Sequence, residues 1–214
     1  MRLLAVILMG ALSSTSVWAQ GHLRPDESPF HSSLPEYYSA VGKVLLADVP
    51  LDAPTVVSLP SLEVEWSAWV LKGPEPKACS RVASAPIWNG DKPSEPHRPR
   101  RPPSIKCVPL SRSIADDVEE VWGVMLRDVR NPPPSNVITL DGVSYHFAGF
   151  DNHEHLAGQV DNPEPDTTTG RLVAAAIALR AYSTNPSPEG EKTLCRLVAA
   201  IRPESRRVGT RCMP

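Results

Sequence analysis

Proline constrains this chain more than any other residue. The 214-residue sequence contains 24 prolines, about double the share found in ordinary globular proteins. Proline lacks a backbone N–H and its ring clashes with the preceding helical turn, so it breaks helices and is excluded from the interior of sheets. The proline content therefore argues against an all-helical bundle. It predicts long irregular connections between short helices and strands.

The first nineteen residues have the pattern of a secretory signal peptide. Arg2 precedes an apolar run, Leu3–Leu12, and Ala19 follows at a position where signal peptidase requires a small residue. The run is too short to cross a bilayer core of roughly 30 Å as a helix. The alternative is a buried N-terminal helix. We expect residues 1–19 to be removed, and the mature protein to be periplasmic or secreted with no transmembrane segment.

The rest of the chain is expected to form one domain. Residues 20–38 are polar and rich in turn-forming residues, which predicts a flexible N-terminal arm. Residues 39–214 are enough for a single core of ordinary size.

The cysteines support an oxidising compartment. All four lie in the mature region, and an even number in an exported chain indicates disulfides. Three pairings are possible, and we favour Cys79–Cys107 and Cys195–Cys212, because each would enclose a proline- or arginine-rich segment that packs poorly alone. A metal site is the alternative, but no C-x-x-C spacing is present.

Several segments have strand patterns. Leu62–Leu71 alternates between apolar and polar residues, as a strand does. Asp141-Gly142 separates Val137–Leu140 from Val143–Phe147, which predicts a hairpin closed by a type I′ turn. A third strand is expected over Leu156–Val160. Together these segments predict a small antiparallel sheet.

Three segments are expected to form helices. The first begins with Ser113 as N-cap and Asp116 at the third helical position, which is close to a capping box. Its apolar residues recur at helical spacing as far as Val129. Two more helices are expected over Arg171–Tyr182 and Glu189–Ile201. The predicted fold class is therefore α+β, with a central amphipathic helix, two C-terminal helices and long proline-rich loops.

Residues 89–106 form a loop rich in proline and arginine. The loop contains P-x-x-P spacings and the basic residues Arg98, Arg100 and Arg101. This composition is typical of polyproline II or disordered segments. Two interpretations stay open: the loop recruits a partner through its arginines, or it is merely solvated.

A cluster of histidines and acids is the one dense set of potential metal ligands. It comprises His146, Asp151, His153 and His155, which could hold zinc or another divalent ion. However, His-Glu-His at 153–155 is not the H-E-x-x-H pattern of a zinc protease helix. The same residues are also ordinary at the tip of a turn. Motifs of serine nucleophiles and phosphate-binding glycine loops are absent from the sequence.

One stretch of the chain resembles a pattern seen in small uncharacterised secreted proteins of Gram-negative bacteria. The matching parts include Trp122-x-x-Met125-Leu126, Asp141-Gly142-x-x-Tyr145-His146-Phe147, Gly158 and Gly170-x-Leu172-Val173, within Trp122–Tyr182. The resemblance implies an α+β domain and a periplasmic or extracellular setting. It implies no known activity and no catalytic residues.

These features favour an exported, non-enzymatic binding protein of the bacterial envelope, for example one that acts as an immunity protein or inhibitor. The expected partner is another protein, without a cofactor and without nucleic acid, because overall acidity and sparse aromatics disfavour nucleic-acid binding. Residues 20–75 are acidic and residues 171–214 are basic, an asymmetry that could steer a partner. A hydrolase or metal-dependent enzyme is the alternative function, and a structural envelope component is the second.

Overall fold

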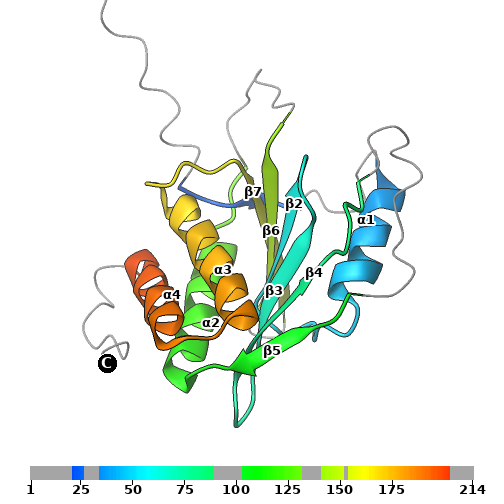
Figure 1. The fold of residues 1–214 in the computed structure, drawn as a ribbon. Coiled ribbons are helices and arrows are strands. Elements are labelled where there is room, and N and C mark those ends of the chain that lie inside the picture. Colours follow the sequence, from blue (N-terminus) through cyan, green and yellow to red (C-terminus); the bar gives the residue numbers. More distant parts are fainter. Residues whose placement is uncertain (1–20, 27–33, 89–102, 132–140, 152–153, 203–214) are drawn as a thin grey trace, which may run out of the picture.

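The computed structural model describes residues 21–26, 34–88, 103–131, 141–151 and 154–202. Within these residues the protein has an α+β fold, in which helices cover both faces of an antiparallel sheet (Figure 1). The strands are β1 (Arg24–Pro25), β2 (Thr55–Pro60), β3 (Trp66–Leu71), β4 (Lys77–Val82), β5 (Lys106–Pro109), β6 (Val143–Asp151) and β7 (Glu154–Asp161). The helices are α1 (Pro35–Val41), the π-helical turn η1 (Gly42–Leu46), α2 (Arg112–Arg127), α3 (Thr168–Thr184) and α4 (Pro188–Ile201).

The strands are ordered β1-β7-β6-β2-β3-β4-β5, and every neighbouring pair is antiparallel. The predicted α+β class with an antiparallel sheet is therefore confirmed. The strand expected over Leu156–Val160 is also confirmed, because β7 pairs with β6 from Ser144–Asp161 to Asp151–Glu154.

Three helices cover one face of the sheet. In Figure 1, α2, α3 and α4 lie together on one side, and their apolar residues form a single core with the sheet. Trp122 of α2 packs edge-to-face on Phe147 of β6, with ring centroids 5.5 Å apart. The apolar stripe predicted for α2 is thus confirmed. The helix begins earlier than predicted, because its N-cap is Ser111 and not Ser113.

The opposite face is covered by α1 and η1 (Figure 1). Two polar side chains of the sheet satisfy carbonyl groups at the end of η1: the Ser67 hydroxyl donates to Leu45 O at 2.9 Å, and buried Arg81 donates at 2.8 Å to the carbonyl of Ala47, the residue after η1. Buried carbonyl groups need such partners. These hydrogen bonds fix α1 and η1 on the sheet and thereby position the candidate site.

The described sheet pairs β6 with other strands than the one predicted across Asp141-Gly142. β6 has both of its edges occupied, by β2 on one side and by β7 on the other. The other strand of the predicted hairpin, Val137–Leu140, lies outside the described residues. A type I′ turn needs positive φ at both central residues, and Gly142 has a φ of 152° but Asp141 is not among the described residues with positive φ. The predicted turn type is therefore wrong.

The N-terminal region also differs from the expected flexible arm over residues 20–38. Leu23 is fully buried, and Arg24 and Pro25 form β1, which pairs with β7. Tyr37 of α1 is buried as well. Leu23 packs in the core beneath α2, α3 and α4, and Tyr37 packs in the core beneath α1. The described parts of this region therefore belong to the domain.

The disulfide Cys79–Cys107 is present, and it joins directly opposed residues of β4 and β5. Closing a loop of this size stabilises a fold by roughly 3 kcal/mol in the chain-entropy account. Cys195 is disulfide-bonded too, and its expected partner Cys212 lies outside the described residues. No helix within the described ranges is long and apolar enough to cross a membrane.

An ion-pair cluster ties the end of α4 to α2. Arg202 contacts Asp117, which is buried, and Glu120, at 2.8 Å. Burial raises the pKa of Asp117 above its ordinary value, and this effect outweighs the attraction of Arg202.

The raised pKa predicts a measurable pH dependence. The native state holds the Asp117 proton more tightly than the unfolded state, so the stability from this group is present below its unfolded pKa and is lost as pH rises through the folded value. The free energy of unfolding of the wild type, measured relative to the Asp117→Asn variant, should therefore fall as the pH rises above about 4, the ordinary pKa of an aspartate. Urea unfolding of both proteins over a series of pH values measures it, and a rising difference would contradict the interpretation.

Candidate functional site: an aromatic pocket beside helix α1

A pocket of about 320 Å³ opens between α1, the end of β2 and the start of β6. We call it the aromatic pocket. Its lining is Tyr37, Tyr38, Leu59, Pro60, Ser61, Leu62, Trp88, Asp141 and Ser144. The volume is within the range of small-molecule and peptide side-chain sites.

The rings of the pocket form a row. Tyr37 lies in the middle, with its centroid 5.2 Å from Trp88 and 5.4 Å from Tyr38, and both contacts are edge-to-face. The ring of His146 continues the row at 6.0 Å from Tyr38. Such perpendicular rings hold one another in fixed positions, so the pocket wall is built in advance of any ligand.

An exposed apolar side chain stands at the pocket's rim. Leu62 lines the pocket and is 86 % exposed. A lone exposed leucine is ordinary, but this one lines the same pocket as three aromatic rings. Apolar and aromatic groups at the surface, framed by polar Ser61, Asp141 and Ser144, are typical of a binding site.

The pocket is anchored from below by Glu65, which is fully buried. Its Oε2 accepts from the backbone N–H of Ile87 at 2.7 Å, and its Oε1 accepts from Trp88 N–H at 2.8 Å and from the Tyr37 hydroxyl at 3.0 Å. A carboxylate removed from water needs such donors. One side chain therefore fixes two of the three pocket aromatics, one on α1 and the other after β4.

The Tyr37 hydroxyl has a single role in this arrangement. Burial, followed by the charge of Glu65, raises the pKa of Tyr37 far above its ordinary value. The hydroxyl therefore stays protonated at every physiological pH, and it serves as a hydrogen-bond donor to Glu65.

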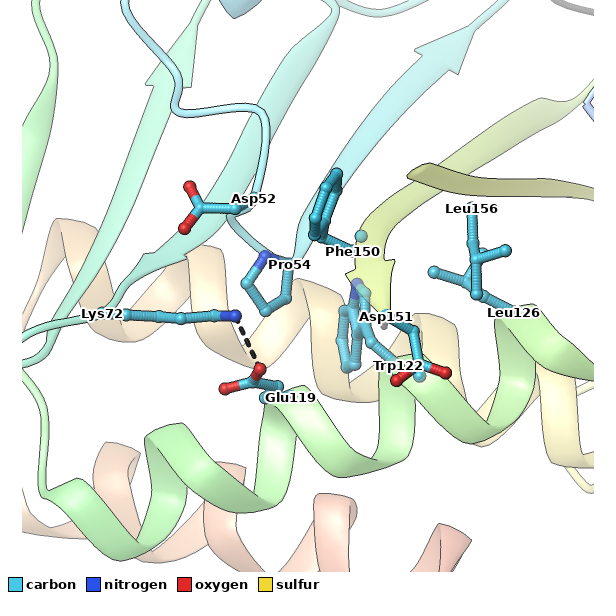
Figure 2. A pocket seen from close by; sticks show the side chains of 11 residues that line it. Asp52, Pro54, Lys72, Glu119, Trp122, Leu126, Phe150, Asp151 and Leu156 are labelled. Atoms are coloured by element: carbon cyan, nitrogen blue, oxygen red, sulfur yellow. Dashed lines mark hydrogen bonds and ion pairs between the residues drawn. The ribbon is translucent and has the colours of Figure 1, made fainter. Parts of the chain in front are cut away.

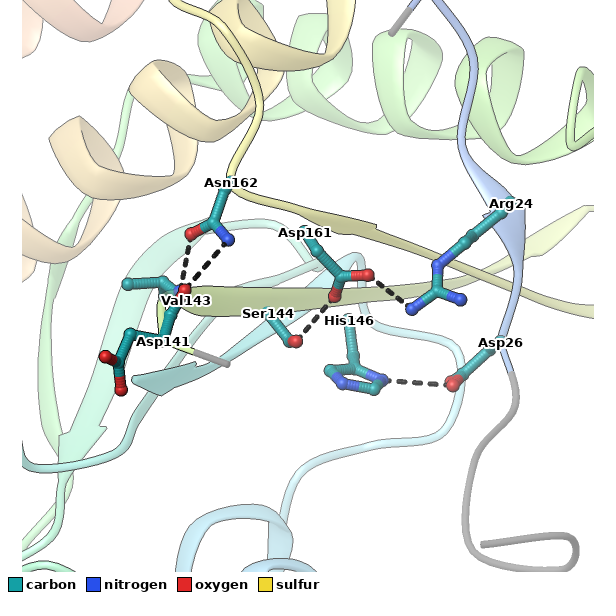
Figure 3. Close-up of polar contacts among 8 residues, drawn as sticks. All are labelled: Arg24, Asp26, Asp141, Val143, Ser144, His146, Asp161 and Asn162. Carbon is teal, nitrogen blue, oxygen red and sulfur yellow. Dashed lines mark hydrogen bonds and ion pairs between the residues drawn. The ribbon is translucent and has the colours of Figure 1, made fainter. Parts of the chain in front are cut away.

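A polar network braces the β6 side of the pocket (Figure 3). The Ser144 hydroxyl donates to Asp161 at 2.5 Å, Asp161 contacts Arg24, and His146 Nδ1 lies 3.0 Å from Asp26. In Figure 3, Ser144 and His146 project from the same side of β6. The network joins β1, β6 and β7, and thus ties the N-terminal segment to the pocket wall.

A second, much smaller cavity lies between α2 and the turn before β2 (Figure 2). It encloses about 10 Å³, which is space for roughly one water molecule. Lys72 and Glu119 form an ion pair of 2.6 Å at its edge. This cavity is too small for a substrate, so it carries no site.

The candidate metal ligands are not brought together. His146 and Asp151 lie on opposite faces of β6, because five residues separate them along an uninterrupted strand. Asp151 pairs with Arg127 of α2 at 2.7 Å, and exposed His155 lies opposite Phe150 near the hairpin tip. His153 lies outside the described residues. Among the described residues, no group of three potential metal ligands is found.

The other candidate residues are beyond what the structure describes. Arg98, Arg100 and Arg101, proposed above as partner contacts, lie in residues 89–102, outside the described ranges. Of the remaining loop predicted at 89–106, Lys106 begins β5.

Sequence reasoning missed Glu65, Tyr37, Tyr38 and Trp88. Glu65 occupies the polar face of the alternating segment before β3, which suggests exposure to solvent. One signal in the sequence could have indicated that this face is buried. Trp69 lies on the same face, and a large apolar residue among polar ones indicates that a second layer covers that face of the sheet. Comparison with protein-family models, curated proteins and solved structures finds no match to this chain.

Proposed function

We propose that this chain is an exported, non-enzymatic binding protein of the bacterial envelope, and that it binds a segment of another protein in the aromatic pocket. The observation that carries the proposal is the preassembled row of Trp88, Tyr37 and Tyr38 beside exposed Leu62. Tyrosine and tryptophan supply large contact areas and dominate the energetics of protein interfaces. An immunity protein or inhibitor is one concrete form of this function.

Export is supported by two features. The signal-peptide pattern over residues 1–19 directs the chain out of the cytoplasm, and the disulfide Cys79–Cys107 suits an oxidising compartment. The proposed location is therefore the periplasm or the cell exterior.

Binding is favoured over hydrolysis by the polar groups next to the pocket. His146 and Asp26 are paired like the base and orienting acid of a hydrolase, but His146 Nε2 is buried and without a partner. The Ser144 hydroxyl donates to Asp161 and not to the histidine. General-base catalysis requires the base within hydrogen-bond reach of the proton it removes, and among the described residues no hydrogen bond joins Ser144 to His146.

The proposal is tested by capturing partners from native envelope extract on the mature, oxidised protein. The variant Trp88→Ala removes an aromatic wall of the pocket, and Leu51→Ala is the matched control, since Leu51 is 80 % exposed and outside the pocket lining. We expect a protein retained by the wild type and by Leu51→Ala, and at least ten-fold depleted on Trp88→Ala. Equal retention on all three proteins would contradict the proposal.

A further inference from the structure

The aromatic pocket has the chemistry of a site for an extended, proline-containing, basic peptide. Grooves lined by tyrosine and tryptophan bind polyproline II segments, because such segments are already extended and lose little entropy on docking. The one charged residue of the described lining is Asp141, an acid. A ligand that offers prolines to the rings and a cation to Asp141 would match both features.

A segment of this chain has that chemistry. Prolines 93, 96, 99 and 102 recur at every third position, and a polyproline II helix has three residues per turn. All four prolines would therefore lie along one edge of such a helix. The residues at 92, 95, 98 and 101 share a second edge at the same period, and they are Lys92, Glu95, Arg98 and Arg101. This edge would place the two arginines beside Pro99 and Pro102, at the C-terminal end of the proline edge.

The segment is attached at the pocket. Trp88 lines the pocket and immediately precedes the segment, and Asn89-Gly90 is a turn-forming dipeptide that can reverse the chain direction. The far end of the segment is tied to β5, three strands from β2, or roughly 14 Å at ordinary strand spacing. Fourteen residues, 89–102, span about 43 Å as polyproline II, so the chain is long enough to turn and cross the pocket.

The dimensions of the pocket fit as well. The centroid of Tyr37 lies 5.2 Å from that of Trp88 and 5.4 Å from that of Tyr38. One polyproline II turn, roughly 9 Å, is within the greatest span that these two distances allow between Trp88 and Tyr38. Two prolines of a P-x-x-P unit could therefore contact these two rings.

We propose that residues 92–102 of this chain are an intramolecular ligand of the aromatic pocket, bound through their proline edge to the rings and through an arginine to Asp141. The inference rests on the proposed function, because it assigns an occupant to the same pocket. A tethered ligand has an effective concentration in the millimolar range, so the segment occupies the pocket even when its affinity for the pocket is weak. An external partner must then compete with the chain's own segment.

The test uses a fluorescent peptide of residues 91–104 and the mature, oxidised protein. In one variant, residues 92–102 are replaced by a glycine-serine linker of equal length; in a second, Pro96 and Pro99 are replaced by alanine in the full chain. Fluorescence polarisation measures the peptide's Kd for each protein. The control peptide has the same composition, with its prolines moved off the three-residue spacing.

We expect the linker variant and the Pro96→Ala/Pro99→Ala variant to bind the peptide at least ten-fold more tightly than the wild type does. Trp88→Ala in the linker variant should abolish binding, and the control peptide should bind at least ten-fold more weakly. Two results would overturn the inference: equal Kd values for the two peptides, or no peptide binding to either variant.

Failure of the inference is distinguishable from failure of the proposed function. If the peptide does not bind, but capture of the envelope partner still depends on Trp88, the pocket is a binding site with a different ligand. A wild-type dimer that dissociates on Pro96→Ala/Pro99→Ala substitution would place the segment in the pocket of a second copy, and that result would also overturn the intramolecular assignment.

Discussion

Replacing Glu65 with alanine is expected to lower the free energy of unfolding by about 4 kcal/mol. The substitution leaves the N–H groups of Ile87 and Trp88 without their acceptor in a site that water does not reach. It also removes the partner of the Tyr37 hydroxyl. The loss should be measured by urea unfolding of the mature, oxidised protein. The comparison is valid if the slope of the unfolding free energy against urea concentration, the m value, is the same for both proteins.

Two variants separate the possible causes. Glu65→Gln keeps the size of the side chain and one oxygen acceptor, so a loss of about 2 kcal/mol is expected. Glu63→Ala removes a nearby exposed carboxylate and should change stability by at most about 0.5 kcal/mol. A loss below about 1 kcal/mol for Glu65→Ala would show that Glu65 does not anchor the pocket.

Replacing Gly170 with alanine is expected to destabilise the protein by about 3 kcal/mol. Gly170 lies in the first turn of α3, and a Cβ atom there would be 2.0 Å from the carbonyl oxygen of Glu164. That oxygen belongs to the backbone, and the Thr167 side chain both donates to it and accepts from Gly170 N–H. The clash can be relieved only by disrupting the start of the helix.

Gly190 provides a matched control for Gly170. It has the same position in α4, where its N–H donates a hydrogen bond of 3.0 Å to the Ser187 hydroxyl. A Cβ at Gly190 would meet the Ser187 Oγ at 3.1 Å, a contact that a small adjustment relieves. Thermal unfolding should therefore show Gly190→Ala within about 1 kcal/mol of the wild type, since alanine is otherwise the better helix former. Equal effects of the two substitutions would contradict this account.

Local patterns predicted the helices well and the sheet only in part. α2 and α4 follow from apolar periodicity, and α3 follows from an alanine-rich run that is apolar nearly all round. These signals act within a few residues. The pairing of β6 with β2 joins residues nearly ninety positions apart. Strand pairing over that separation depends on burial of the whole face, which the turn signal at Asp141-Gly142 does not report.

The aromatic pocket could not be predicted because its residues come from distant segments. Tyr37, Leu59, Trp88 and Ser144 belong to four different parts of the chain, and no short motif links them. The role of Glu65 as the buried anchor of the pocket can be recognised only when α1 is known to cover the second face of the sheet. The disulfide Cys79–Cys107, by contrast, was favoured from the even number of cysteines and from the proline-rich segment that this pair encloses.

The most direct test of the central claim compares two exposed leucines. A photo-activated cross-linking residue is introduced in place of Leu62, at the rim of the aromatic pocket, or in place of Leu51, which is equally exposed outside the pocket lining. Each mature, oxidised protein is irradiated in native envelope extract, and the cross-linked products are identified by mass spectrometry. The account predicts one partner protein joined at position 62 and not at position 51. The same partner joined at position 51 alone, or equally at both, would contradict it.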